Sequence, residues 1–260
     1  MDQPTTRTID EWDYAVPDRK LTDSEKKRFS GTMEYWYPPL SKISNVKTPQ
    51  TEWVNLKTVK IEPGTIHEMT SATYDMEELR EAVKRIGLPA FIRTDMTSSI
   101  KESDTMKIES LSQTELQKCA GQAIKYNRNW AEVPFSSLVV REWLDIEHYF
   151  TVWGGKKVGV EIRFFTSGST VESWCFDWNP EEIRPDTNNW KEDYQKTKDI
   201  AKENVEEVLP KAQAVANKFK DYGTGSWSVD FVRTTNGEWY CTDMAPRKQS
   251  QVCHEPFTLV

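Results

Sequence analysis

The sequence has few of the residues on which common catalytic and metal sites are built. Only three of its 260 residues are histidine, and His67, His148 and His254 lie too far apart to match the ligand spacing of a zinc site. No Gly-x-Ser-x-Gly segment is present, so the sequence does not support the nucleophile elbow of a serine hydrolase. The absence of Gly-x-x-x-x-Gly-Lys-Ser/Thr argues against a P-loop.

Cysteine and long apolar runs are also scarce. Cys119, Cys175, Cys241 and Cys253 form no Cys-x-x-Cys pair, and this scatter predicts reduced, buried thiols of an intracellular protein. The N-terminal sequence MDQPTTRTIDEW contains no apolar signal core. No segment approaches the roughly 18 apolar residues that a membrane span needs. We therefore expect a cytoplasmic protein that does not enter a membrane.

Positive charge is in deficit. The chain carries 34 basic and 41 acidic residues, and its net charge of −7 argues against non-specific nucleic-acid binding. Hydrophobic residues make up only 37%, but the 11 tryptophans indicate that large aromatic side chains form much of the core or line a cleft. The length allows one large domain or two modest ones.

Helical and extended patterns are mixed along the chain. A helix is predicted over 75–87, because Asp75 and Glu78 resemble a capping box and Gly87 provides a stop. Further helices are expected from Ser112 onward and over 190–209, where Pro210 either kinks the helix or begins the next one. Strands are expected at 53–61, 89–95, 137–143, 158–165 and 170–176, with a hairpin turn at 154–155. The mixture predicts an α+β or mixed α/β fold.

An aromatic segment interrupts the polar N-terminal part of the chain. Residues 1–30 are polar, and we expect them to be loosely held. Residues 33–40 read MEYWYPPL, with three consecutive aromatics before two prolines. They either pack this segment onto the body of the protein or cover a cleft or partner site, and packing is the preferred interpretation.

The clearest local signal is a β-hairpin over 227–246. Asn236-Gly237 separates two strand-like runs, and this dipeptide is typical of a two-residue turn with positive φ at both positions. Counting outward from such a turn places Asp230 opposite Asp243, with their Cβ atoms about 4.5–5.5 Å apart. Opposed like charges are destabilising unless compensated, and Mg²⁺ held by oxygen ligands would compensate them. The alternative is two carboxylates at a solvated sheet edge.

Three other strand-like segments carry candidate binding residues. In 91–101, Arg93 precedes a Thr/Ser-rich turn that leads to Lys101, a pattern that suits phosphate but also an ordinary loop. In 138–147, an apolar strand ends at Arg141-Glu142-Trp143, which is either an adenine-bordering hinge or a buried strand. In 160–165, Glu161 and Arg163 share one face, as they also would in a purely structural ion pair.

The order of these motifs resembles the ATP-grasp fold. Within it, the sequence is similar to the eukaryotic cell-division-cycle proteins that assemble translation initiation factor two, and to related phage ATP-grasp proteins. WYPPL resembles that family's Trp-Tyr-Pro-Leu segment, LVVREW its hinge, and VEIRFF its Glu-Phe-Arg-Cys-Phe strand. FIRTDMTSSIK is similar to its first nucleotide-binding strand and loop, and VDFVRTTNGEWYCTDMAP to its metal hairpin. The resemblance spans about 36–246.

The resemblance implies two lobes, with Mg-ATP in a cleft between them. The lobes would cover 31–136 and 137–260, after the loosely held segment 1–30. Arg163 would reach the β- and γ-phosphates and act in catalysis, and Asp230 and Asp243 would hold Mg²⁺. The other nucleotide contacts implied are Arg93 and Lys101 at the phosphates, and Arg141, Glu142, Trp143 and Leu144 along the adenine.

Two departures from the family pattern bear on the site. The family hairpin ends Asp-x-Asn-Pro, and its Asn helps to hold Mg²⁺, whereas this chain has Ala245 there. The stretch 147–158 is longer than the family's connection from hinge to strand, which suggests a lid or a substrate loop.

The resemblance supports two classes of function. The first is an ADP-forming ligase that activates a carboxylate as an acyl phosphate for attack by an amine or another nucleophile. The second is an assembly factor that binds ATP, holds a protein partner and turns over negligibly. ATP-dependent nucleic-acid ligation or repair is disfavoured by the net charge of −7.

Overall fold

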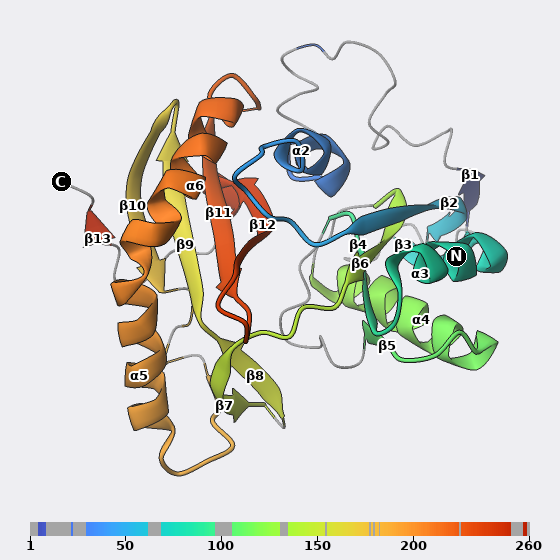
Figure 1. Ribbon diagram of the computed structural model, residues 1–260. Coiled ribbons are helices and arrows are strands. Elements are labelled where there is room, and N and C mark those ends of the chain that lie inside the picture. Colours follow the sequence, from blue (N-terminus) through green and yellow to red (C-terminus); the bar gives the residue numbers. More distant parts are fainter. Residues whose placement is uncertain are drawn as a thin grey trace. The chain divides into compact units, whose positions relative to one another are not determined.

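The computed structural model describes residues 5–8, 22, 30–61, 69–96, 106–130, 135–153, 155–176, 178, 180–181, 183–223, 225–250 and 257–258. The chain divides into two compact units. The first comprises Met1–Arg19 and Gln50–Trp143, and the second comprises Lys20–Pro49 and Leu144–Val260. Each is built on its own antiparallel sheet (Figure 1).

The sheet of the first unit has the order β1-β2-β6-β4-β5, with β3 also paired to β2. Two helices, α3 (Met76–Ile86) and α4 (Gln113–Trp130), supply apolar side chains to its core. Alternate strand residues such as Val54, Ile92 and Val140 join them in one buried cluster. The strands are β1 (Thr5–Thr8), β2 (Thr51–Ile61), β3 (Met69–Tyr74), β4 (Ala90–Thr94), β5 (Lys107–Ile108) and β6 (Ser137–Glu142).

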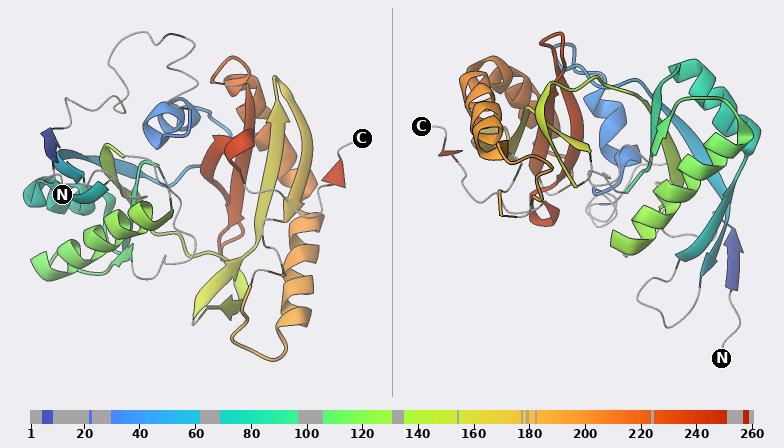
Figure 2. Two further views of the ribbon diagram at one scale, coloured as in Figure 1. Left: turned by 180° about the vertical axis from the view of Figure 1, so that it is seen from behind. Right: turned by 90° about the horizontal axis from the view of Figure 1, so that it is seen from below.

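The sheet of the second unit has the order β12-β11-β9-β10-β13. Helix α6 (Val205–Phe219) lies along β9, β10 and β11, and α5 (Trp190–Glu203), which leads into α6 end to end, also contacts β10 (Figures 1 and 2). Phe219 meets Trp227 edge to face, with ring centroids 5.5 Å apart. The strands are β9 (Glu161–Ser167), β10 (Thr170–Phe176), β11 (Ser226–Arg233), β12 (Trp239–Pro246) and β13 (Phe257–Thr258), and a short 3-10 helix, η3 (Arg247–Gln249), follows β12.

The aromatic segment MEYWYPPL forms helix α2 (Met33–Leu40) of the second unit. Met33, Trp36, Tyr37 and Leu40 are all buried, so the preferred interpretation that this segment packs onto the body is confirmed. The Tyr37 hydroxyl donates to the Pro49 carbonyl at 2.6 Å. After α2 the chain runs beside β12, where Lys47 and Tyr240 form a parallel bridge.

The predicted helix over 75–87 is confirmed with its caps. Asp75 accepts hydrogen bonds from the backbone N–H groups of Glu77 and Glu78, and the chain leaves the helix at Gly87 with φ of 93°. The predicted helix over 190–209, with a kink or a new helix at Pro210, is wrong in its bounds. The break falls at Asn204, whose side-chain amide donates to the Ile200 carbonyl, and Pro210 lies inside α6.

Two further expectations are corrected in the second unit. The strand expected over 158–165 is divided at Val160, whose N–H donates to the Glu147 carbonyl while its own carbonyl accepts from the Arg233 N–H. The expectation that all four cysteines are reduced is wrong, since Cys175 is disulfide-bonded, while Cys119 and Cys241 are free and buried.

Two other observations concern the chain as a whole. Thr5–Thr8, within the segment expected to be loosely held, pairs with β2 as strand β1. Among the described residues, no helix has the length and apolar character that crossing a membrane requires.

Candidate functional site

The predicted acidic and basic residues of the second unit lie in one row across its sheet. Asp243 on β12 is opposite Asp230 on β11, which is opposite Arg163 on β9, and Cys175 on β10 completes the row. Directly opposed residues share a face, and neighbours along a strand alternate. The row therefore lies on the face away from α6, because Val229 and Phe231 share the other face with Trp227. We call this the polar face.

Two local irregularities together produce the opposition of Asp230 and Asp243. The loop holds three residues rather than the predicted two, because Thr234 pairs with Glu238 and Gly237 takes the positive φ of 82°. That change alone would put Asp230 opposite Thr242. A bulge between Asp230 and Phe231 in the register then restores the pairing with Asp243. The predicted opposition is thus confirmed, but the predicted turn is wrong.

Arg163 and Asp230 form a bidentate ion pair on the polar face. Arg163 donates from Nε to one oxygen of Asp230 and from Nη2 to the other, both at 2.7 Å. Both side chains are buried. Asp230 lies directly opposite Arg163, a position that suits the planar guanidinium.

Glu161 is buried two residues before Arg163, and its carboxyl is strongly perturbed. Removal from water, with a smaller contribution from the nearby charge of Asp230, raises the pKa of Glu161 to about 7 against the attraction of Arg163 and Lys156. Burial likewise raises the pKa of Asp230, an effect that the Arg163 charge and hydrogen bonds oppose. Burial is thus the main cause of both shifts, and the Arg163 charge opposes it at each carboxyl.

The hairpin offers oxygen ligands of the kind that Mg²⁺ takes. The carboxylates of Asp230 and Asp243 are adjacent across the ladder, and Asp243 is only partly buried. Within the described residues no group of three acidic, histidine or cysteine side chains converges to hold a metal. Two carboxylates nonetheless fit Mg²⁺, which keeps several waters and takes other oxygens from substrate phosphates. Ala245 lies on the same face and is opposite Ser228.

The first unit carries its two predicted arginines on one face of its sheet. Arg93 on β4 is opposite Val139, and Arg141 on β6 is opposite Phe91, which places both on the face away from the core cluster of Ile92 and Val140. Both side chains are buried. Arg93 donates from Nε to the Thr94 carbonyl, and Arg141 donates from Nε to the Thr51 hydroxyl at 3.3 Å.

The remaining predicted residues lie where β6 ends. Glu142 accepts a hydrogen bond from the Gln50 N–H at 3.2 Å, and the Trp143 ring lies 6.4 Å from the Phe91 ring, between centroids. Leu144 is the first residue of the second segment of the second unit. Lys101 lies outside the described residues, so the prediction that it contacts phosphate stays a prediction.

Sequence reasoning missed two buried charged groups, one in each unit. Asp95 follows β4 and accepts hydrogen bonds from the backbone and hydroxyl of Ser136, the latter at 2.8 Å. Lys156 is buried on β8 (Lys156–Gly159). Its strand could have been anticipated from the turn at 154–155, but nothing in the local pattern distinguishes Lys156 from Lys157.

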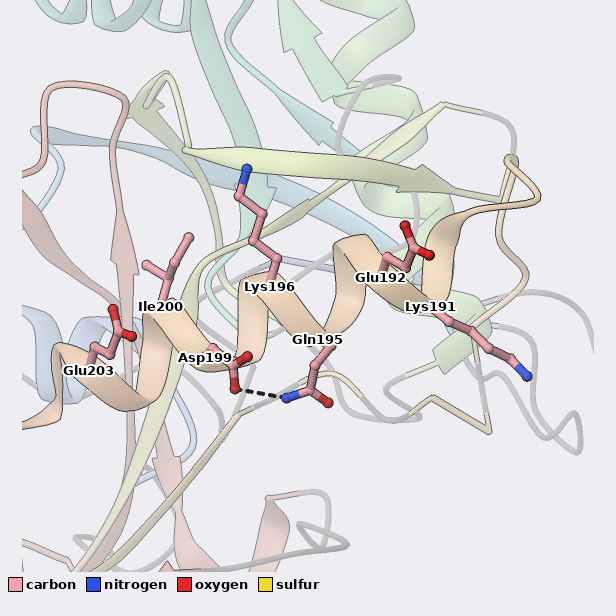
Figure 3. A pocket seen from close by; sticks show the side chains of 7 residues that line it. All are labelled: Lys191, Glu192, Gln195, Lys196, Asp199, Ile200 and Glu203. Atoms are coloured by element: carbon pink, nitrogen blue, oxygen red, sulfur yellow. Dashed lines mark hydrogen bonds between the residues drawn. The ribbon is translucent and has the colours of Figure 1, made fainter.

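A groove of about 590 Å³ runs along α5, and none of the predicted site residues lines it (Figure 3). Acidic and basic side chains alternate along the helix that lines the groove. The side-chain amide of Gln195 donates to a carboxylate oxygen of Asp199 at 2.8 Å. Lys196 stands over the Tyr149 ring, 3.9 Å from its centroid. The lining residues are Lys191, Glu192, Gln195, Lys196, Asp199, Ile200 and Glu203.

Comparisons with known proteins agree with this architecture. No protein-family model matches the chain, and no curated protein sequence matches it. Among solved structures, C-terminally truncated Cdc123 from Schizosaccharomyces pombe matches with a TM-score of 0.51 and 17% identity, over 87% of this chain and 86% of that one. The chain has the ATP-grasp fold.

Two further ATP-grasp matches are more distant. N5-carboxyaminoimidazole ribonucleotide synthetase, purK, in its ADP complex gives a TM-score of 0.45 at 13% identity, over 85% of this chain and 46% of that one. The ATP-grasp ligase PsnB with a minimal precursor gives 0.42 at 11% identity, over 85% and 53%. The chain spans about half the length of these two ligases.

Proposed function

We propose that this protein binds Mg-ATP and is an ADP-forming ATP-grasp ligase that activates a carboxylate as an acyl phosphate. The observation that carries the proposal is the row of Asp243, Asp230 and Arg163 on the polar face. Two carboxylates suit a divalent cation, and an adjacent guanidinium suits a phosphate. Such an arrangement supplies what phosphoryl transfer needs, which is charge stabilisation and positioning of the transferred group.

Asp230 and Asp243 would hold Mg²⁺, which when bound neutralises charge that develops on the phosphates. In the protein alone, Asp230 is held by Arg163. When Mg²⁺ is held by the two aspartates, Arg163 would donate its planar fork to a phosphate. Arg163 is therefore the residue that we assign to stabilisation of the transferring phosphoryl group.

Residues of the first unit would contribute further contacts. Arg93 and Arg141 are buried cations on one face of their sheet, and we assign Arg93, with Lys101, to the phosphates. Arg141, Glu142, Trp143 and Leu144 are assigned to the border of the adenine. The Trp143 ring supplies an aromatic surface of the kind that stacks on a base.

The test of ligase activity is the formation of ADP in response to an acceptor. Purified protein should release ADP from Mg-ATP slowly when no acceptor is added. In a screen of amines, amino acids and peptides, the compound that is the acceptor should make ADP release much faster. A protein that binds Mg-ATP but releases no ADP with any acceptor would instead be an ATP-binding assembly factor for a protein partner. Because Trp36 and Tyr37 are buried, we place the partner surface of such a factor elsewhere than on these two rings.

A further inference from the structure

The stretch 147–158, which suggested a lid or a substrate loop, folds as a hairpin of β7 (His148–Val152) and β8. The backbone N–H of Trp153 donates to the Arg184 carbonyl at 2.8 Å, and the N–H of Gly155 donates to an Asp186 carboxylate oxygen at 2.8 Å. These bonds fasten the hairpin tip to the chain before α5, so the hairpin is a fixed element of the second unit. A residue suited to the second substrate of the proposed ligase lies instead on the polar face.

This residue is Arg247, which begins η3 directly after β12. The guanidinium carbon of Arg247 lies 5.3 Å from the centroid of the Phe165 ring on β9. Its Nη1 donates to a carboxylate oxygen of Glu172 on β10. The strand order is β12-β11-β9-β10, so the side chain of Arg247 joins the end of β12 to the strand three places away.

Phe165 places the Arg247 guanidinium on the polar face. Phe165 follows Arg163 by two residues on β9, and strand residues two apart point to the same face. The ladder partners of Phe165 are Ser228 on β11 and Ser173 on β10, and they form a second row beside that of Arg163. Neighbouring rows on one face are about 7 Å apart. Two guanidinium groups therefore lie on this face in adjacent rows.

The two arginines differ in how firmly they are paired. Arg163 is held by Asp230 in a buried pair, whereas the side chains of Arg247 and Glu172 are 39% and 43% exposed. An exposed ion pair is screened by water and contributes little free energy. The Phe165 ring supports the Arg247 guanidinium independently of Glu172, because arginine stacks favourably on an aromatic face. Arg247 can therefore exchange Glu172 for another anion and keep its position.

The partner that Arg247 has in the structure indicates the class of ligand. Glu172 offers a carboxylate, and the planar fork of a guanidinium matches the two oxygens of that group. A ligase of the proposed kind must hold a carboxylate beside the γ-phosphate, which we assign to Arg163. Guanidinium groups in adjacent rows suit this requirement, because one row would take the phosphate and the next row the carboxylate.

We propose that Arg247 binds the carboxylate of the compound that this protein activates, and that Glu172 takes the place of that carboxylate when the compound is absent. The proposal rests on the proposed ligase function and deepens it, because it names the residue that holds the acid. An oxygen of the bound carboxylate attacks the γ-phosphorus, the bond from that phosphorus to the bridging oxygen breaks, and the products are ADP and an acyl phosphate. Arg247 contributes by positioning the attacking group.

The test is a calorimetric titration of phosphonoacetate, in which one carbon joins a carboxylate to a phosphonate, into protein saturated with Mg-ADP. Wild type should bind this probe. Arg247→Met should bind it about tenfold or more weakly, because a charge-assisted contact is lost. Lys248→Met is the matched control, since Lys248 is the next residue of η3 and is exposed. This control should bind the probe within about twofold of wild type.

Glu172→Gln provides a second test, which remains valid if Arg247→Met does not fold. The substitution keeps Arg247 and removes the carboxylate that competes for it, so phosphonoacetate should bind about twofold to fivefold more tightly than to wild type. A purely structural role of the ion pair predicts weaker or unchanged binding in this variant. Either of those results would overturn the inference.

The titrations also separate this inference from the proposed function. If wild type binds Mg-ADP but not phosphonoacetate, or if Arg247→Met binds phosphonoacetate as tightly as wild type, Arg247 does not hold the carboxylate. Both results leave the proposed nucleotide binding intact. Absence of Mg-ADP binding to wild type would overturn both proposals.

Discussion

Arg163 and Asp230 are each other's partner across two neighbouring strands, joined by two hydrogen bonds of 2.7 Å in a buried setting. We assign Arg163 to a phosphate and Asp230 to a metal. In the protein without ligands, the two side chains neutralise each other's charge. Breaking a buried pair from one side leaves an uncompensated charge. Substitutions here should therefore change both stability and binding, and measurements must separate the two.

Replacing Arg163 by Lys should weaken Mg-ATP binding about tenfold or more. Lysine keeps the charge but loses the planar fork that can bind two oxygens at once. The dissociation constant is measured by calorimetry, at a temperature where circular dichroism shows that the variant is folded. Arg233→Lys is a matched control, because Arg233 pairs with Glu147 at 2.8 Å elsewhere in the second unit. Unchanged affinity in Arg163→Lys would return Arg163 to a structural role.

The two aspartates should respond differently to removal of their charge. Asp230→Asn takes away the partner of a buried arginine and should lower the free energy of unfolding by about 3 kcal/mol. Asp243→Asn should leave the metal-free protein as stable as wild type, or more stable by about 0.5–1 kcal/mol through relief of repulsion. Urea titration in the presence of a chelator measures both. A large loss of stability in Asp243→Asn would contradict this assignment of partners.

Ala245→Asn should tighten Mg²⁺ binding. Ala245 lies two residues after Asp243 on the same face of β12, so an amide oxygen there would add a neutral ligand beside the two carboxylates. The measurement is a calorimetric titration of Mg²⁺ into protein saturated with ADP. Ala245→Leu, which adds bulk without an oxygen, is the control. Equal Mg²⁺ affinity in Ala245→Asn and wild type would mean that the cation is not bound at this end of the hairpin.

Glu161 should make the metal-free protein less stable as the pH rises from about 4.5 to about 7. Burial raises the pKa of this carboxyl from 4.5 to about 7, so in that interval the folded state holds a proton that the unfolded state has lost. The associated stability is complete below about pH 4.5 and is lost as the pH passes 7. Glu161→Gln should therefore match wild type near pH 4.5 and be more stable at pH 8, by ~3 kcal/mol at most.

Urea titrations of both proteins across this interval measure the difference directly. Carboxylates that do not interact with Glu161 contribute equally to the two proteins and cancel, so the difference reports Glu161 together with the neighbouring Asp230 and Asp243. A difference between Glu161→Gln and wild type that does not change with pH would contradict the raised pKa.

The sequence was sufficient for the elements whose signals are local. The helix that starts at Asp75 and ends before Gly87 carries its own caps, and β11 and β12 carry their own turn. The opposition of Asp230 and Asp243 was predicted from a two-residue loop. Asp230 and Asp243 are nonetheless opposed in the structure, because the longer loop and the bulge shift the register by equal and opposite amounts. Neither irregularity can be recognised from the sequence alone.

Features that depend on distant residues could not be predicted in this way. The pairing of Arg163 with Asp230 requires β9 and β11 to be neighbours, and they are separated in the chain by β10 and two helices. The break at Asn204 depends on a side-chain hydrogen bond, whereas Pro210 is accommodated inside α6. The burial of Lys156 depends on Trp178, which lies beyond β10 and approaches only in the folded chain.

The most direct test of the central proposal is calorimetric titration of Mg-ATP into the wild-type protein and into Asp243→Asn, each with and without a chelator. We expect saturable, metal-dependent binding to wild type that stabilises it against heat by mass action, and loss of the metal dependence in Asp243→Asn. If wild type shows neither heat of binding nor a rise in melting temperature at millimolar Mg-ATP, the protein does not bind this nucleotide. If Asp243→Asn binds Mg-ATP as tightly as wild type, the hairpin is not the metal site.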